Sequence, residues 1–149
     1  MNGIDIIMKA AALAGKAHAG QFDKSGVDYI NHPLTVAADV ASKGYDYRVI
    51  VAALLHDVAE DCEYTLDDIS GMFPDDSEII AALTLLTHDD EVPYMEYVEA
   101  VKSNEIARAV KMADLRHNMD LSRFGDKQLT DRDVKRLEKY KAAYSLLEK

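Results

Sequence analysis

The sequence predicts an all-α fold, and three observations predict it. Apolar residues recur at the three-to-four-residue spacing of amphipathic helices along nearly the whole chain. No segment has the alternation of apolar and polar residues that a half-buried strand requires. The sequence also contains no internal repeat and no low-complexity linker. With 149 residues, 48% of them hydrophobic, the chain can bury one core, so residues 1–149 are predicted to form a single domain.

The first part of the chain is predicted to form three helices. The first, over 4–18, ends in the polar, glycine-containing segment GQFDKSGVDYIN. Pro33 is expected at the first position of the next helix, where its missing amide donor is not needed, and Gly44 should end that helix. The third helix, over 47–61, is apolar on nearly every side along VIVAALL, which predicts a central, buried position.

Shorter helices are predicted to follow. Thr65 and Asp68 have the spacing of an N-cap and an acid in the first turn, and Pro74 limits the helix that they begin. The periodic segments further along the chain predict helices over 76–87, 94–102, 104–121 and 131–147.

Charge and cysteine content restrict the classes of partner. A net charge of −10 and a pI near 4.8 leave no basic surface, so long nucleic acid is not an expected partner. The single Cys62 fits a reducing compartment, for which the cytoplasm is the default. The segment KAAALAGK has only six uncharged residues between its lysines, too few for a signal-peptide core or a membrane span. We therefore expect a soluble, cytoplasmic protein that is intact from Met1.

The segment ALLHDVAEDC, residues 53–62, carries ionisable groups directly behind an apolar run. In a helix, side chains four residues apart share a face, so His56 would lie with Glu60, and Asp57 with Asp61. Asp57 also continues the apolar stripe, so its carboxylate is predicted to point inward, where it would be destabilising if unpaired. The alternative interpretation is a solvated acidic helix end capped by Asp61.

A second inward carboxylate favours a metal site. Asp114 lies four residues after Val110, at the edge of the core face of its predicted helix. Two inward aspartates on two helices need a shared cation. His32, held extended by the following proline, would add an imidazole, although an exposed surface histidine is the alternative. With His56 and Asp57 the site would contain two imidazoles and two carboxylates, which suits Mn²⁺ or Fe²⁺, whereas structural zinc favours thiolates.

These residues resemble those of the HD-domain metal-dependent phosphohydrolases, in which a histidine, a His-Asp pair and a later aspartate occur in this order. Within that superfamily the sequence is similar to the hydrolase domain of RelA/SpoT homologues and to the small alarmone hydrolases. The motifs AGKAHAGQF, KSGVDYINHPLTVA, VIVAALLHDVAEDCEYTLDDI and VKMADLRHNM carry the resemblance. It implies a single HD hydrolase domain over residues 1–149, a bundle of roughly eight to ten helices.

The resemblance also implies roles for individual residues. Glu60 and Asp61 would lie next to the metal-activated water as proton-transfer and orienting groups. Asn118 matches a family residue that contacts the nucleotide sugar, and Lys24 and Ser25 match positions near the base and phosphates. The implied metal ligands are His32, His56, Asp57 and Asp114.

The implied activity is metal-dependent hydrolysis of a small nucleotide, with Mn²⁺ as the first candidate ion. In the alarmone hydrolases of the stringent response, the reaction removes pyrophosphate from the ribose 3′ position of guanosine tetra- or pentaphosphate and leaves GDP or GTP. Alarmone synthesis is not expected, because the chain is too short for the synthetase domain of the bifunctional enzymes. Two alternatives are a phosphohydrolase of another small nucleotide or phosphate ester and a nucleotide-binding sensor without turnover. Both a monomer and a homodimer are compatible with the sequence.

The sequence departs from the family in the loop before His32. Alarmone hydrolases usually carry an arginine just before the lysine of KSG, and this residue is Asp23 here. The usual Gly-Glu-Pro-Tyr reads Gly-Val-Asp-Tyr from Gly26 to Tyr29. An acid in place of a stacking cation removes a cation–π contribution of about 0.5–2 kcal/mol and adds repulsion toward phosphates. The departure bears on the preference for guanine and leaves the metal ligands unchanged.

Other polar residues are weaker candidates. His18 and His117 can support the pocket or the metal site, although packing is the expected role of His117, and His88 is expected in a solvated loop. Tyr94 and Tyr97 either cover the pocket mouth or belong to the core. A phosphate-facing cation, with Arg116 as the first candidate, is sought among Arg108, Lys111, Arg116 and Arg123.

Overall fold

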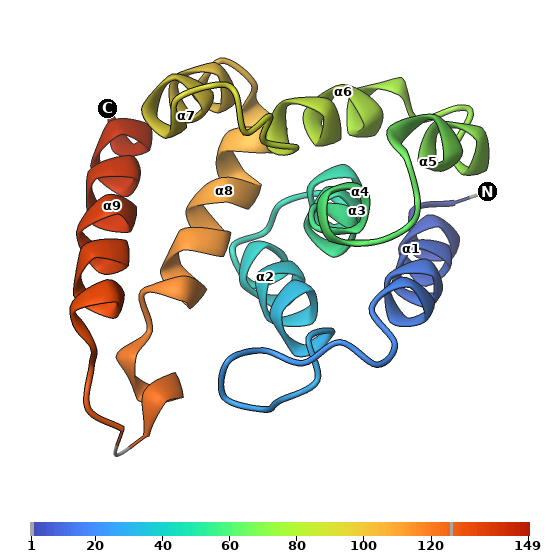
Figure 1. Cartoon of the computed structure of the whole chain (residues 1–149). Helices are drawn as coiled ribbons and strands as arrows, with labels where there is room; N and C mark the ends of the chain where they lie inside the picture. Colours follow the sequence, from blue (N-terminus) through green and yellow to red (C-terminus); the bar gives the residue numbers. More distant parts are fainter. Residues whose placement is uncertain (1, 126) are drawn as a thin grey trace.

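The computed structural model describes residues 2–125 and 127–149, and of Phe124 it describes the backbone alone. Over these residues the protein is a helical bundle without a β-strand, which confirms the predicted all-α class (Figure 1). Its elements are α1 (Gly3–Ala17), α2 (Asn31–Ser42), α3 (Tyr47–Leu55), α4 (Val58–Asp61), α5 (Leu66–Met72), α6 (Ser77–Leu86), α7 (Tyr94–Lys102), α8 (Glu105–Asn118), the 3₁₀ turn η1 (Leu121–Phe124) and α9 (Asp131–Glu148).

Helix α3 lies at the centre of the bundle and contacts α1, α2, α6 and α8 (Figure 1). Every residue from Val51 to Leu55 is buried, which confirms the predicted central helix. Helices α7 and α9 pack on α8 at one side of the molecule. Because α2, α3 and α8 contact one another pairwise, residues on these three helices that are far apart in the sequence can meet.

Side-chain caps define several helix starts. Thr65 and Asp68 form a complete capping box at the start of α5, as their spacing predicts. Thr130 and Asp133 form a second capping box at the start of α9. Over the described residues, no helix combines the length and apolar character needed to cross a membrane.

The predicted helix over 47–61 is wrong in its second half. Helix α3 ends at Leu55, His56 and Asp57 form a turn, and the chain resumes in the four-residue α4. The His56 ring explains the break, because its Nδ1 lies 2.5 Å from the carbonyl oxygen of Ala53. In a continuous helix that carbonyl would accept the amide of residue 57, so the ring replaces a backbone partner at the helix end.

Two other boundaries also differ from the prediction. Helix α2 begins at Asn31, so Pro33 is its third residue rather than its first; amides in the first turn have no intrahelical partner, so proline is tolerated there as well. The predicted helix over 104–121 ends at Asn118, and Asp120 caps the separate turn η1 that follows.

Candidate metal centre and substrate pocket

Two histidines and two aspartates from three parts of the chain converge in the core. His32 lies in the first turn of α2, His56 and Asp57 form the turn after α3, and Asp114 lies on α8. All four are buried. His32 Nε2 lies 2.8 Å from Asp114 Oδ1 and 3.7 Å from Asp57 Oδ2. His56 Nε2 lies 3.1 Å from Asp57 Oδ2 and 3.7 Å from Asp114 Oδ1.

The four donor atoms suit a divalent cation. Ligand atoms about 2.1 Å from such an ion lie about 3.0–3.4 Å apart at angles of about 90–109°. The observed separations lie close to this range, and the donor atoms of His32, His56 and Asp57 lie within 4.8 Å of one another. The Nε2 atom of His56 is buried and has no hydrogen-bond partner among the described residues. A cation-binding site therefore explains an otherwise unsatisfied buried nitrogen.

Without a cation, the charges of this cluster are balanced by protons. Burial alone would lower the pKa of His56, but the adjacent carboxylates of Asp57 and Asp114 raise it well above its usual value. Burial would likewise raise the pKa of Asp114, but Lys111 and the histidines hold it well below the usual value. A metal ion would take over this balancing charge, so its binding must release protons.

Neighbouring side chains orient the clustered groups. The Tyr29 hydroxyl donates a hydrogen bond to Asp57 Oδ2 over 2.8 Å. Lys111 Nζ lies 3.0 Å from Asp114 Oδ2, while Asn118 Nδ2 donates to Asp114 Oδ1 over 3.0 Å. Such contacts fix carboxylate orientation around a metal site. The role of Tyr29 is not predicted from the sequence, where its one signal is its position in the loop motif before His32.

His117 fixes the orientation of the His32 ring. Their Nδ1 atoms lie 2.6 Å apart, and the rings stack with centroids 4.9 Å apart. Burial, Arg123 and His32 lower the pKa of His117 to about 4, so His117 is neutral at pH 7 and can accept the hydrogen bond. His32 then donates from Nδ1 and directs its Nε2 toward Asp114. This contact is more specific than the packing role expected from the sequence.

Glu60 and Asp61 lie on α4, immediately after the cluster in the sequence, and both are accessible to solvent. Partial burial and the negative charges of Asp57 and Asp61 raise the pKa of Glu60 to about 7. Partial burial and Asp57 also raise the pKa of Asp61, whose Oδ2 lies 3.5 Å from the Tyr29 hydroxyl. A carboxyl group with a pKa near neutrality can both accept and donate a proton at physiological pH.

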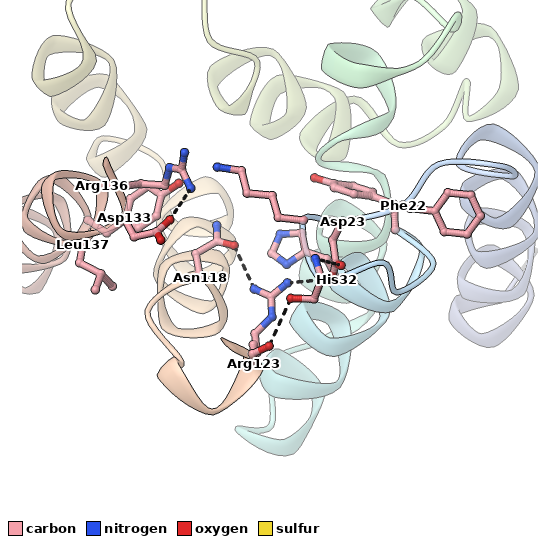
Figure 2. Close-up of a pocket in the computed structure, with 12 residues that line it drawn as sticks. Phe22, Asp23, His32, Asn118, Arg123, Asp133, Arg136 and Leu137 are labelled. Carbon is pink, nitrogen blue, oxygen red and sulfur yellow. Dashed lines mark hydrogen bonds and ion pairs between the residues drawn. The ribbon is translucent and has the colours of Figure 1, made fainter. Parts of the chain in front are cut away.

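A cavity of about 440 Å³ adjoins the cluster (Figure 2). It brings together the three residues predicted to contact the substrate, Lys24, Ser25 and Asn118, with His32 and Tyr29. Helix α9 forms another wall, which is not predicted from the sequence because no motif marks it. The wall residues from α9 are Asp133, Arg136, Leu137 and Tyr140.

The predicted cation Arg116 does not line this cavity. Its guanidinium bonds Asp39 at 2.9 and 3.1 Å and the Tyr144 hydroxyl at 3.2 Å, and so connects α8 to α2 and α9. Among the four candidate cations, Arg123 is the one that lines the cavity, so the prediction of Arg116 is wrong. Arg108 instead donates to the carbonyl of Leu147.

The remaining aromatic and histidine candidates do not line this cavity, although the His18 ring packs against Tyr29 of its wall at 5.0 Å between centroids. Tyr94, Tyr97 and His88 pack against one another, with ring centroids 4.6–5.9 Å apart. Lys111 Nζ lies 5.7 and 5.3 Å from the two tyrosine ring centroids, so these rings pack around the cation that contacts Asp114. His18 is buried, with its Nδ1 bonded to the side chain of Gln21.

Asp23, which replaces the usual family arginine, is fully engaged in its own loop. Its Oδ1 accepts the amides of Ser25 and Val27 at 2.8 and 3.0 Å, and its Oδ2 lies 3.3 Å from Arg123 Nη2. These contacts hold the pKa of Asp23 below its usual value despite partial burial. The repulsion toward phosphates expected from this acid is therefore offset by Arg123.

Residues 10–142 match the family model described as HD domain. The chain therefore belongs to the HD-domain family. Among solved structures, a chain described as a metazoan ortholog of SpoT that hydrolyzes ppGpp is similar, with a TM-score of 0.75 and 23% sequence identity. That likeness covers 95% of this chain and 85% of the other, and it confirms the helical fold.

Two curated relatives are similar in sequence. A probable GTP pyrophosphokinase of Mycobacterium leprae is 34% identical over 128 residues, covering 81% of this chain and 16% of that protein. A guanosine-3′,5′-bis(diphosphate) 3′-pyrophosphohydrolase of Haemophilus influenzae is 35% identical over 119 residues, covering 72% of this chain and 17% of that protein. The chain thus spans less than a fifth of the length of these relatives.

The raised pKa of Glu60 predicts a titration in the metal-free protein. The Glu60 carboxyl should titrate near pH 7, because burial and two neighbouring carboxylates disfavour its charged form. Carbon-detected NMR of the side-chain carboxyls measures the midpoint, with the exposed Glu99 as an internal reference. In Asp57→Asn, the loss of one negative charge should move the midpoint down.

The raised pKa of Glu60 also predicts how the folding stability of the metal-free protein depends on pH. Because the folded-state pKa exceeds the unfolded value of 4.5, Glu60 contributes stability that is complete below pH 4.5 and is lost as the pH rises to about 7. A Glu60 midpoint close to 4.5 in the folded protein would contradict the environment described above.

Proposed function

We propose that the protein is a metal-dependent phosphohydrolase that removes pyrophosphate from the ribose 3′ position of guanosine tetra- or pentaphosphate. The observation that carries the proposal is the convergence of His32, His56, Asp57 and Asp114 beside a nucleotide-sized cavity. The name of the Haemophilus influenzae relative supports this reaction. We assign the activity to residues 1–149 as one hydrolase domain, in the cytoplasm, and place it in alarmone breakdown during the stringent response.

In this proposal the four clustered side chains hold one divalent cation. The mixed nitrogen and oxygen donors favour Mn²⁺, with Fe²⁺ as the second choice. The bound ion supplies charge stabilisation at the phosphoryl group and a water nucleophile at neutral pH. Tyr29 and Lys111 hold the carboxylates of Asp57 and Asp114 in place, and His117 keeps the lone pair of His32 Nε2 directed into the site.

Glu60 is the proton-transfer group of the proposed reaction. It accepts a proton from the attacking water as the new oxygen–phosphorus bond forms. The bond between phosphorus and the ribose 3′ oxygen breaks, and Glu60 returns the proton to that oxygen, which leaves GDP or GTP. Asp61 lies one residue further along α4 and orients the water. Lys24, Ser25 and Asn118, which line the cavity, bind the nucleotide there.

The substrate assignment is tested by incubating the purified protein with Mn²⁺ and guanosine tetraphosphate. Pyrophosphate and GDP should appear in equal amounts, because one bond is broken in each turnover. Parallel reactions with adenosine and guanosine monophosphates test the alternative of another phosphate ester. Turnover of a monophosphate alone would reject the substrate, and tight binding of every nucleotide without product would favour a sensor.

Asp114→Ala should abolish both metal binding and activity, because it removes one donor and leaves Lys111 without its buried partner. Calorimetric titration with Mn²⁺ measures the metal affinity, and circular dichroism follows the helical fold. Asp39→Ala is the matched control, because it removes another partly buried, ion-paired aspartate that lies outside the cluster. Unchanged Mn²⁺ affinity in Asp114→Ala would exclude Asp114 as a ligand.

The Glu60→Gln variant should still bind the metal ion but should hydrolyse the substrate more slowly. The amide preserves shape but cannot accept the water proton, so kcat should fall about 10²–10⁴-fold with little change in Mn²⁺ affinity. The acidic limb of the pH–rate profile should also disappear, since rate rises with pH as Glu60 loses its proton. Normal turnover by this variant would remove Glu60 from the proposed mechanism. The exposed Glu63→Gln, at the end of the same segment, serves as the control.

A further inference from the structure

We propose that Lys24, Arg123 and Arg136 form a second anion-binding subsite, which binds the phosphate group of the nucleotide that is not cleaved. The inference rests on the proposed function and adds a requirement to it. A good substrate must carry an anionic group at its 5′ end as well as the pyrophosphate at its 3′ end.

The first support is the charge of the cavity wall. Three different segments bring the cations together: Lys24 from the loop after α1, Arg123 from η1 and Arg136 from α9 (Figure 2). The carboxylates of Asp23 and Asp133 are the acidic groups of the wall over the described residues. The wall therefore carries a net positive charge, whereas the whole chain carries −10. A positive pocket in an acidic protein concentrates anionic ligands.

The second support is that the cations are incompletely neutralised. Arg136 Nη1 lies 3.7 Å from Asp133 Oδ1, at the limit of an ion pair. Lys24 has no ion-pair partner in the part of the chain that the structure describes. Partial burial and the nearby charge of Arg136 lower the pKa of Lys24. Cations held near one another are stabilised when an anion binds between them.

Arg123 is held in a fixed orientation, and some of its N–H donors have no partner among the described residues. Its Nη1 donates to the His117 carbonyl at 3.2 Å. Figure 2 shows its contacts with Asn118 and Asp23: Nη1 lies 3.4 Å from Asn118 Oδ1, and Nη2 lies 3.3 Å from Asp23 Oδ2. A guanidinium has five N–H donors, so these contacts leave about two for a ligand. A prepositioned guanidinium loses little entropy when it binds a phosphate.

The three cations and the cluster border the same cavity. Of the four clustered residues, His32 is the one that lines this cavity over the described residues, and Asn118, which also lines it, bonds both Asp114 and Arg123. Apolar surface from Phe22, Leu137 and Tyr140 completes the wall and can cover a base and sugar. A nucleotide that places one phosphate group at the cluster can therefore place another at the cations.

The test compares two ligands that differ only at the 5′ end, guanosine 3′,5′-bis(diphosphate) and guanosine 3′-diphosphate. Calorimetric titration is done with the Mn²⁺-loaded protein in the Glu60→Gln background, which slows turnover. The 5′ diphosphate should improve affinity about tenfold to 100-fold, as expected for charge-assisted hydrogen bonds. Arg136→Gln should lose most of that advantage while binding guanosine 3′-diphosphate as before, and Lys24→Met should weaken the binding of guanosine 3′,5′-bis(diphosphate) more than that of guanosine 3′-diphosphate.

Lys135→Gln is the matched control, since it removes an exposed cation from α9 outside the cavity wall. Thermal unfolding verifies that each variant folds. The proposed subsite would be overturned if the unsubstituted pocket bound the two ligands with equal affinity. It would also be overturned if Arg136→Gln and Lys135→Gln reduced the affinity advantage of the 5′ diphosphate by the same factor. Failure of the proposed function gives a different result: the unmodified protein would release no pyrophosphate from either ligand, whatever the affinity difference.

Discussion

The burial of two aspartates at one point in the core is the constraint on which the rest of the structure depends. Asp57 and Asp114 come from separate helical regions and reach the same point in the core. Two carboxylates in a poorly solvated site repel each other unless positive charge lies between them. In the protein alone, His56 and Lys111 face these carboxylates, and the Nε2 atoms of the two histidines are the donors that a divalent cation would bind. Charge balance thus explains both the stability and the reactivity of the site.

The surrounding bundle is arranged to keep these groups in place. Every residue from Val51 to Leu55 at the end of α3 is buried, so the turn that follows is positioned by the core rather than by a flexible loop. Lys111, which packs against the rings of Tyr94 and Tyr97, contacts Asp114, and the Tyr29 hydroxyl donates to Asp57. Each carboxylate therefore has a partner that sets its orientation before any ligand arrives.

The sequence was sufficient to predict the helical class, the central helix and the four residues that converge. Helix periodicity, capping residues and the ordered histidines and aspartates are local signals, so they can be read from one chain. The break at His56 was missed because it depends on a ring bonding the Ala53 carbonyl, which periodicity does not encode. The prediction of Arg116 rather than Arg123 as the phosphate-facing cation is wrong, because helix spacing alone cannot show that Asp39 on another helix binds Arg116. The α9 wall was missed for the same reason: it is defined by packing between distant segments.

The short length of α4 has an evolutionary consequence. Four residues carry both acids of the proposed chemistry, and Val58 is the residue that buries this segment in the core. Asp57 precedes α4 as its N-cap residue, and the other members of the cluster lie on α2, at the end of α3 and on α8. Substitutions in α4 can therefore alter the reaction without dismantling the scaffold, so one bundle of this kind can give rise to enzymes of different chemistry as well as to inactive binding proteins.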